Sequence, residues 1–130
     1  CKSAAKIAES EGVVLATECH NWTLTDTKEG AIKLLGEVNS LHLKTFWQPN
    51  QFKKVEENIE YAKLVAPFTE TVHVFNWDKN KKYPLSKAID IWKKYSECFE
   101  GNIPFLLEFM PDDKLSSLKN EVASLNKIRK

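Results

Sequence analysis

The sequence predicts an α/β fold in which one leading helix is followed by four strand–helix units that share a parallel sheet. Apolar runs of strand length alternate along the chain with segments whose apolar residues recur at helical spacing. Each strand–helix unit is about thirty residues long, which is the length of a βαβ crossover. Crossovers of this kind place their strands in parallel and cover the sheet with helices. The 130 residues are enough for one hydrophobic core, so we expect residues 1–130 to form a single domain.

The first two elements are a helix and a strand. The leading helix is expected over residues 3–11, and Gly12 follows it at the position of a helix-ending glycine. The apolar run at 13–17 predicts the first strand, which ends at Glu18. Since no polar residue alternates within this run, we expect both faces of the strand to be covered.

The next three elements are a helix, a strand and a helix. The second helix is expected to begin at or near Asp26, because the segment from Asp26 to Glu29 has the character of a capping box. The second strand is predicted at 41–47. Apolar residues at spacings of three and four predict the third helix over 55–66, and Pro67 ends it.

The rest of the chain repeats the pattern. The third strand is expected at 71–75, a polar loop at 76–84, the fourth helix at 86–99 and the fourth strand at 104–109. The last helix follows a pair of aspartates at 112–113. Its expected buried stripe consists of Leu115, Leu118, Val122, Leu125 and Ile128.

Composition excludes several classes of protein. With 19 Lys and Arg against 18 Asp and Glu, the chain lacks the basic excess of a nucleic-acid binder. No apolar run approaches the ~20 residues of a membrane-spanning helix. Cys1, Cys19 and Cys98 show no CxxC spacing, which indicates reduced thiols in a cytoplasmic protein. Because the chain opens with Cys1 in a helix-like segment, we expect it to be part of a longer protein.

The candidate chemistry lies at the strand ends, which meet along one edge of a parallel sheet. Glu108 stands in the apolar run at 104–109, and Glu18 directly follows the run at 13–17. Burying an unpaired carboxylate costs several kcal/mol, so each needs a partner. A salt bridge at the rim would satisfy either carboxylate alone. Two carboxylates at one edge favour a shared cation, because they otherwise repel each other.

A histidine and an amide accompany the two carboxylates. His73 lies in an apolar strand, where a histidine is more often a core residue than a ligand. Beside Glu18 and Glu108 it becomes a candidate nitrogen ligand, and Gln48 follows the second strand with an amide oxygen. This oxygen-rich set favours Mn²⁺, Mg²⁺ or Co²⁺ over a thiolate-type zinc site, and Zn²⁺ itself stays open.

Several further side chains are candidates for binding a substrate. Tryptophans follow or end three of the strands, where an aromatic ring suits the apolar CH face of a sugar, although packing of the loops would also explain them. A histidine lies just beyond Glu18, and a lysine in the polar loop overhangs the same rim. These candidate substrate-binding residues are His20, Trp22, Trp47, Trp77 and Lys79.

Four segments, at 15–20, 46–49, 72–77 and 106–109, carry a resemblance to a known family. Together they resemble the xylose-isomerase-like TIM-barrel superfamily, whose members include sugar-phosphate isomerases and epimerases and the AP endonuclease family. The resemblance covers nearly the whole chain. It implies that the chain is the C-terminal (βα)4 half of a (β/α)8 barrel, preceded by one helix.

The resemblance also implies a metal site. In this superfamily, the four strand ends carry Glu, Asp, His and Glu as ligands of one divalent metal. Glu18, His73 and Glu108 match these positions, whereas Gln48 replaces the aspartate. A neutral amide at this position should weaken the affinity for metal. The superfamily's epimerases also use a basic residue after the histidine strand, and Lys79 is the nearest candidate.

The implied function is metal-dependent isomerisation or epimerisation of a sugar or sugar phosphate through an ene-diolate. Glu18 and Glu108 would act as the base and the acid on opposite faces of the reacting carbon. Two alternatives stay open: a phosphodiesterase similar to AP endonucleases, and a non-catalytic sugar-binding barrel degraded by Gln48. A half barrel should pair with a second copy or with an N-terminal half, and alone it should be inactive.

Overall fold

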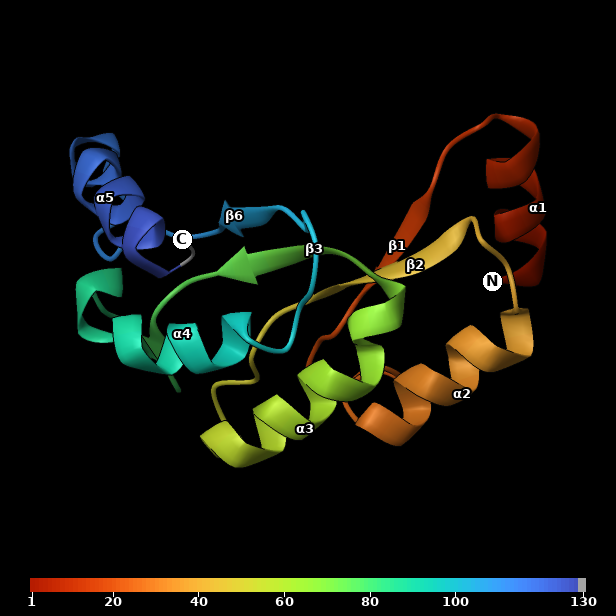
Figure 1. Ribbon diagram of the computed structural model, residues 1–130, viewed down its shortest axis with the longest axis horizontal. Coiled ribbons are helices and arrows are strands. Elements are labelled where there is room, and N and C mark those ends of the chain that lie inside the picture. The colour runs from red at the N-terminus through yellow and green to blue at the C-terminus, as the bar shows by residue number, and fades with distance from the viewer. Residues whose placement is uncertain (129–130) are drawn as a thin grey trace.

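The computed structural model describes residues 1–128, and these form the predicted parallel α/β fold. The helices are α1 (Lys2–Ser10), α2 (Lys28–Val38), α3 (Val55–Val65), α4 (Ile89–Ser96) and α5 (Leu118–Ile128). The strands are β1 (Leu15–Glu18), β2 (Leu43–Trp47), β3 (Thr69–Val74), β4 (Trp77–Asp78), β5 (Lys81–Lys82) and β6 (Phe105–Leu107). One sheet has the order β1-β2-β3-β6, with every pair parallel (Figure 1).

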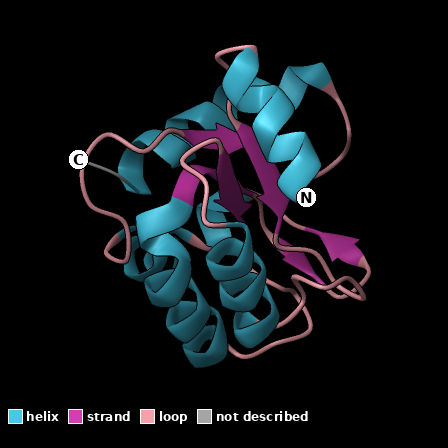
Figure 2. Cartoon of the chain, turned by 90° about the vertical axis from the view of Figure 1, so that its right-hand side faces the viewer, coloured by secondary structure: helices cyan, strands magenta, loops and turns pink. Residues whose placement is uncertain are grey.

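Helices cover one face of this sheet. α2, α3 and α4 lie along that face, whereas α1 and α5 lie at the two ends of the molecule (Figure 1). The strands run side by side in the turned view as well (Figure 2). The core between sheet and helices contains Trp47 of β2, Val72 and Val74 of β3, and Trp92 of α4, all buried. No helix within residues 1–128 is long and apolar enough to cross a membrane.

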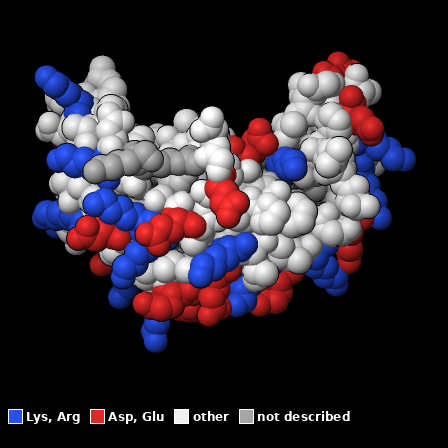
Figure 3. Space-filling view, viewed as in Figure 1, with Lys and Arg blue, Asp and Glu red and all other residues white. Residues whose placement is uncertain are grey.

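The opposite face of the sheet is open. The register pairs Glu18 with Phe46, Phe46 with Thr71, and His73 with Leu106, so these side chains alternate away from the core residues. The molecule is hollowed between the end carrying α1 and the end carrying α5 (Figure 3). Leu106 is 47% exposed on this face. Val13, Val14 and Leu15 are exposed as well, so the prediction that the first strand is covered on both faces is wrong for the described residues.

Three other expectations are corrected by contacts within the fold. Helix α2 begins at Lys28 with Thr27 as its N-cap, whose hydroxyl accepts from the Gly30 N–H, so Asp26 does not cap it. The polar loop at 76–84 contains the antiparallel hairpin β4–β5. A 3-10 turn at Leu85–Lys87 precedes the fourth helix, so α4 begins at Ile89 and not at residue 86.

The buried face of α5 differs from the predicted apolar stripe. Leu115 is 82% exposed, because the chain there forms a 3-10 turn at Leu115–Ser117 before the helix starts. The buried residues of α5 are Glu121, Ser124 and Ile128. The Glu121 carboxylate accepts a hydrogen bond of 2.9 Å from the Leu85 N–H, which turns this polar residue inward. The predicted stripe is confirmed for Ile128, which is buried, and Leu125, which packs against the core, whereas this long-range hydrogen bond adds Glu121 to the buried face.

The open face predicts that the chain associates in solution. We expect the isolated chain to form dimers or larger species at micromolar concentration, because monomeric proteins rarely leave such an apolar face in water. Leu106→Ser should weaken the association, whereas Leu41→Ser, at an exposed position outside the sheet, should not. Light scattering measures the mass, and a well-folded monomer of the unaltered chain would contradict this expectation.

Candidate functional site

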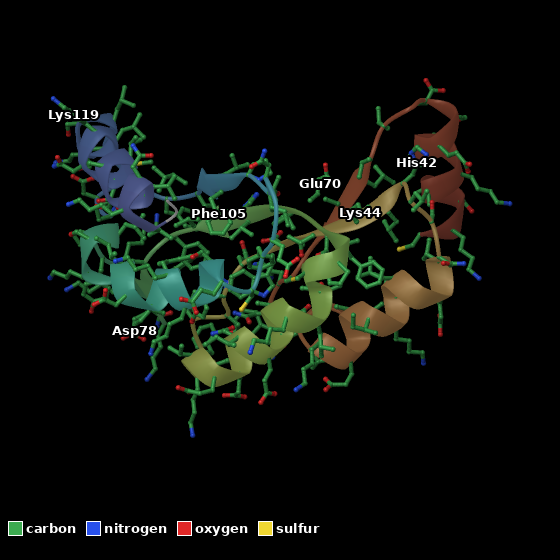
Figure 4. All side chains as sticks on the ribbon, in the orientation of Figure 1. His42, Lys44, Glu70, Asp78, Phe105 and Lys119 are labelled. Atoms are coloured by element: carbon green, nitrogen blue, oxygen red, sulfur yellow. The ribbon has the colours of Figure 1, made fainter. Side chains whose placement is uncertain are left out.

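The four strand-end residues lie at one edge of the sheet. Glu18 is the last residue of β1, and His73 lies one residue before the end of β3. Gln48 directly follows β2, and Glu108 directly follows β6. Because all four strands are parallel, their C-terminal ends form the same rim. Figure 4 shows the side chains around this sheet, with Lys44 of β2 and Phe105 of β6 marked.

These four side chains are arranged as two contacting pairs. Gln48 Nε2 donates a hydrogen bond of 2.9 Å to Glu18 Oε1. His73 Nδ1 lies 3.7 Å from Glu108 Oε2, a distance too long for a hydrogen bond. The His73 ring stacks on Phe46, with ring centroids 4.2 Å apart and planes at 15°. The stacking fixes the imidazole beside the carboxyl of Glu108.

The two pairs influence each other electrostatically. Burial, and to a smaller extent the charge of Glu18, raise the pKa of Glu108 to about 7, and His20 opposes both effects. Burial lowers the pKa of His73, and Glu18 works in the opposite direction. At neutral pH, Glu108 is therefore poised to exchange a proton, while His73 is held neutral. A carboxyl with a pKa near the working pH is suited to general acid–base catalysis.

Two oxygen atoms of this cluster are buried without a hydrogen-bond partner. They are Gln48 Oε1 and Glu108 Oε2. Buried acceptors in folded proteins are nearly always satisfied, so each of these atoms has capacity for a cation or a hydroxyl donor. With a carboxylate from Glu18 and an imidazole from His73, the donor types suit a hard divalent ion.

The predicted metal ligands do not converge on one point in this structure. Within the described residues, no three His, Cys, Asp or Glu side chains lie close enough together to hold a metal ion. Glu18 is engaged by the amide of Gln48, and His73 faces Glu108 instead. Metal binding by Glu18, Gln48, His73 and Glu108 stays a prediction.

A cavity of about 340 Å³ opens at this rim. Its polar part includes Glu18, Gln48 and Glu108, whereas His73 does not line it and lies 3.7 Å from Glu108. Four of the five candidate substrate-binding residues also line it, namely His20, Trp22, Trp77 and Lys79. The volume is in the range of small-molecule sites, at about 300–1,000 Å³.

Trp47 lies elsewhere, so its predicted role as a wall of the substrate site is wrong. It is fully buried on the helix-covered face of the sheet. Its ring meets those of Tyr95 and Phe99 at centroid distances of 5.3 and 5.4 Å. Packing of the core explains this tryptophan, because alternation along β2 turns it away from Gln48.

The hairpin β4–β5 positions another part of the cavity wall. Trp77 packs edge-on against Phe75 and Phe109, with ring centroids 6.3 and 5.2 Å apart. Lys82 is held by an ion pair of 2.6 Å with Asp113 and lies over the Phe109 ring. Lys79, at the hairpin turn, is the lysine that lines the cavity.

Sequence reasoning missed several residues of the cavity. Phe52, Phe75 and Phe109 provide aromatic surface, and Asn50 and Asn80 provide amides. The aromatic residues carried a usable signal, since Phe52 stands in an otherwise polar post-strand loop, Phe75 directly follows β3 and Phe109 lies two residues after β6. Nothing local marked the asparagines, which belong to the site only through tertiary contacts.

Comparison with solved structures shows the fold. The chain is similar to the probable 3-DHS dehydratase of Bacillus anthracis involved in petrobactin synthesis, with a TM-score of 0.75 and 18% identity over 96% of this chain and 53% of that one. It is also similar to a xylose isomerase-like TIM barrel protein of Mycobacterium smegmatis in complex with magnesium, with a TM-score of 0.68 and 17% identity over 98% of this chain and 47% of that one. The chain thus spans about half the length of the structures it matches.

No protein-family model and no curated protein matches its sequence. At the level of fold, the matches to solved structures confirm the predicted parallel α/β architecture of a partial TIM barrel.

The raised pKa of Glu108 predicts an unusual dependence of stability on pH. In chelator, we expect the free energy of unfolding to fall as the pH rises from about 4.5 to about 7, because the folded chain retains a proton on Glu108 that the unfolded chain has released. Glu108→Gln should remove this contribution. Thermal unfolding across pH 4–8 measures it.

Two features make the comparison specific to Glu108. His73, whose pKa is lowered, acts in the opposite direction, since its contribution is present above its ordinary value of 6.5 and is lost on acidification. That contribution is common to the unaltered chain and the variant. Glu70→Gln, on an exposed carboxylate of β3, serves as the control. Parallel pH profiles of the unaltered chain and the Glu108 variant would contradict the assignment.

Proposed function

We propose that this half-barrel carries the acid–base pair of a divalent-metal-dependent isomerase or epimerase acting on a sugar or sugar phosphate. The observation that carries the proposal is the carboxyl of Glu108, with a pKa of about 7, at the same cavity rim as the carboxylate of Glu18. Proton transfer next to a carbonyl needs a group that can both take and return a proton near neutral pH. The fold of the matched structures supports the choice of this chemistry.

The two carboxyl groups would divide the reaction between them. One removes the proton from the carbon next to the carbonyl, and the electron pair moves onto the carbonyl oxygen to give an ene-diolate. In an epimerase, the other returns a proton to the opposite face of the same carbon, and the carbonyl re-forms. In an isomerase, a proton is returned to the former carbonyl carbon, while the proton of the adjacent hydroxyl passes to the former carbonyl oxygen and the new carbonyl forms at the adjacent carbon. The Gln48 amide orients Glu18 through its hydrogen bond. His73, held neutral, lies 3.7 Å from Oε2 of Glu108.

The residues present fit a divalent ion in their chemistry. Glu18, Gln48, His73 and Glu108 would hold it, and the buried, unpartnered oxygens of Gln48 and Glu108 have capacity for it. When bound, such an ion stabilises negative charge on the carbonyl and neighbouring hydroxyl oxygens of a substrate. The magnesium complex of one matched structure supports the metal class.

The other elements of the proposal concern the surroundings of the site. The chain spans about half of each matched structure, so the activity is proposed for the half-barrel together with a second half, either a second copy or an N-terminal half. The three cysteines, Cys1, Cys19 and Cys98, are free, which supports a cytoplasmic location. The second candidate function is a non-catalytic sugar-binding barrel, which the neutral amide of Gln48 on Glu18 favours.

The proposed chemistry makes turnover depend on both carboxylates and on metal. In the complete barrel, we expect Glu108→Gln and Glu18→Gln each to lower kcat by roughly 10²–10⁴-fold, since each removes a proton-transfer group with little change of shape. Chelation should abolish turnover, and Mn²⁺ or Mg²⁺ should restore it. The assay is interconversion within a panel of ketoses, aldoses and their phosphates.

The outcomes separate the parts of the proposal. Glu70→Gln, remote from the rim, should leave turnover unchanged. Undiminished turnover after exhaustive chelation would remove the metal from the mechanism, and full activity of the Glu108 variant would remove the acid–base pair. Binding of a sugar without any turnover would favour the non-catalytic alternative.

Gln48 should control the affinity for metal. We expect Gln48→Asp to tighten Mn²⁺ binding by roughly tenfold, because a carboxylate ligand adds charge at the ion. Gln51→Asp is the matched control, since it adds the same charge in the same loop of the cavity wall. Calorimetry measures both. Equal affinities for Mn²⁺ in the Gln48 variant and the unaltered chain would count against Gln48 as a ligand.

A further inference from the structure

Two aromatic rings are exposed side by side at the mouth of the cavity. Trp22 lies in the loop between β1 and α2, and Phe52 lies in the loop between β2 and α3. Trp22 is 85% exposed and Phe52 is 50% exposed. Their ring centroids are 6.0 Å apart, with planes inclined at 41°. Both residues line the cavity that contains Glu18 and Glu108.

The position of Trp22 is not explained by stability of the fold. A side chain this exposed gains little from burial, and large apolar groups in water at a cavity mouth mark binding surfaces. Its backbone has a φ of 59°, in the left-handed region that bulky residues rarely adopt. Such strain persists only where surrounding contacts hold it in place.

The contact that holds Trp22 comes from Asp26. Oδ2 of Asp26 accepts a hydrogen bond of 3.1 Å from the Trp22 N–H. Since Thr27 caps helix α2, the Asp26 carboxylate is available for this contact. The charged acceptor thereby compensates the unfavourable backbone of the loop.

Asp26 also binds the neighbouring loop, which carries Phe52. Its Oδ1 accepts from Asn50 Nδ2 at 3.1 Å and from Lys53 Nζ at 3.3 Å. Lys53 Nζ donates in addition to the Asp26 carbonyl at 2.6 Å. The Asn50 side-chain oxygen in turn accepts from the Phe52 N–H at 2.9 Å. One carboxylate therefore fixes both loops relative to each other.

We propose that Trp22 and Phe52 form an aromatic platform for the apolar CH face of a sugar, and that Asp26 is its positioning residue. The inference rests on the proposed function and deepens it by assigning the recognition of the substrate's apolar face. Aromatic rings offer a flat surface to such a face. Glu18, Gln48 and Glu108, at the polar part of the same cavity, take the hydroxyl groups.

The test measures dissociation constants for D-xylose, D-fructose and D-fructose 6-phosphate by ligand-observed NMR titration, with glycerol and inorganic phosphate as comparison ligands. Trp22→Ala and Phe52→Ala should each weaken sugar binding by roughly tenfold, and Trp22→Phe should retain most of it. Leu24→Ala is the matched control, because Leu24 is exposed in the same loop but does not line the cavity. In the complete barrel, the platform variants should raise KM and leave kcat nearly unchanged.

Asp26 is tested by a pair of variants. Asp26→Ala should weaken sugar binding as Trp22→Ala does. Asp26→Asn, which keeps an oxygen for the Trp22 N–H, should restore part of the affinity. If Asp26→Ala lowers only the thermal midpoint and leaves the dissociation constants unchanged, Asp26 has a structural role alone and its assignment is overturned.

The outcomes distinguish the platform from the proposed function. If the sugars bind and both alanine variants bind them equally well, the platform is wrong while the proposed function stands. If inorganic phosphate competes for the sugar phosphate and the unphosphorylated sugars do not bind, recognition is through the phosphate and the platform is overturned. If no sugar binds the complete barrel that contains the unaltered chain, the proposed function fails and the platform falls with it.

Discussion

The burial of Trp47 is the interaction on which the arrangement of the site depends. Its indole is fully enclosed between the sheet and helix α4, where it meets the rings of Trp92 and Tyr95 edge-on. Because side chains alternate along a strand, turning Trp47 toward the helices turns Phe46 to the opposite face. Gln48 likewise comes within hydrogen-bond distance of Glu18. A shift of one residue in the register of β2 would turn Trp47 to the open face of the sheet and Phe46 toward the helices.

Partial burial explains the electrostatics of the rim. Glu108 and His73 are partly buried by neighbours on the same face, so each loses water without gaining a full hydrogen-bond partner. Desolvation then disfavours the charged forms, raising the pKa of Glu108 and lowering that of His73. The proton-exchanging character of Glu108 follows from this balance, and Glu18 at the same rim strengthens it.

Polar contacts between successive loops give the cavity its walls. Asp26 joins the loops that follow β1 and β2, and the ion pair of Lys82 with Asp113 joins the hairpin to the loop after β6. These contacts hold the loops that carry Trp22, Phe52 and Trp77 beside the polar residues of the cavity. Residues on such loops can vary the specificity of a site while the sheet preserves its chemistry.

The sequence by itself determined the alternation of strands and helices and the edge at which Glu18, His73 and Glu108 lie, because apolar periodicity and strand ends are local properties. It could not determine which face of the sheet the helices cover. The alternation of side chains along β2 is the same whichever face is covered, and for this reason Trp47 was misplaced. The buried Glu121 and the role of Asp26 were decided by the tertiary structure alone. Each depends on a hydrogen bond between residues that are far apart in the sequence. Glu121 accepts from the Leu85 N–H, and Asp26 accepts from the Asn50 side chain. Local patterns record propensity, whereas such contacts exist only once the chain has folded.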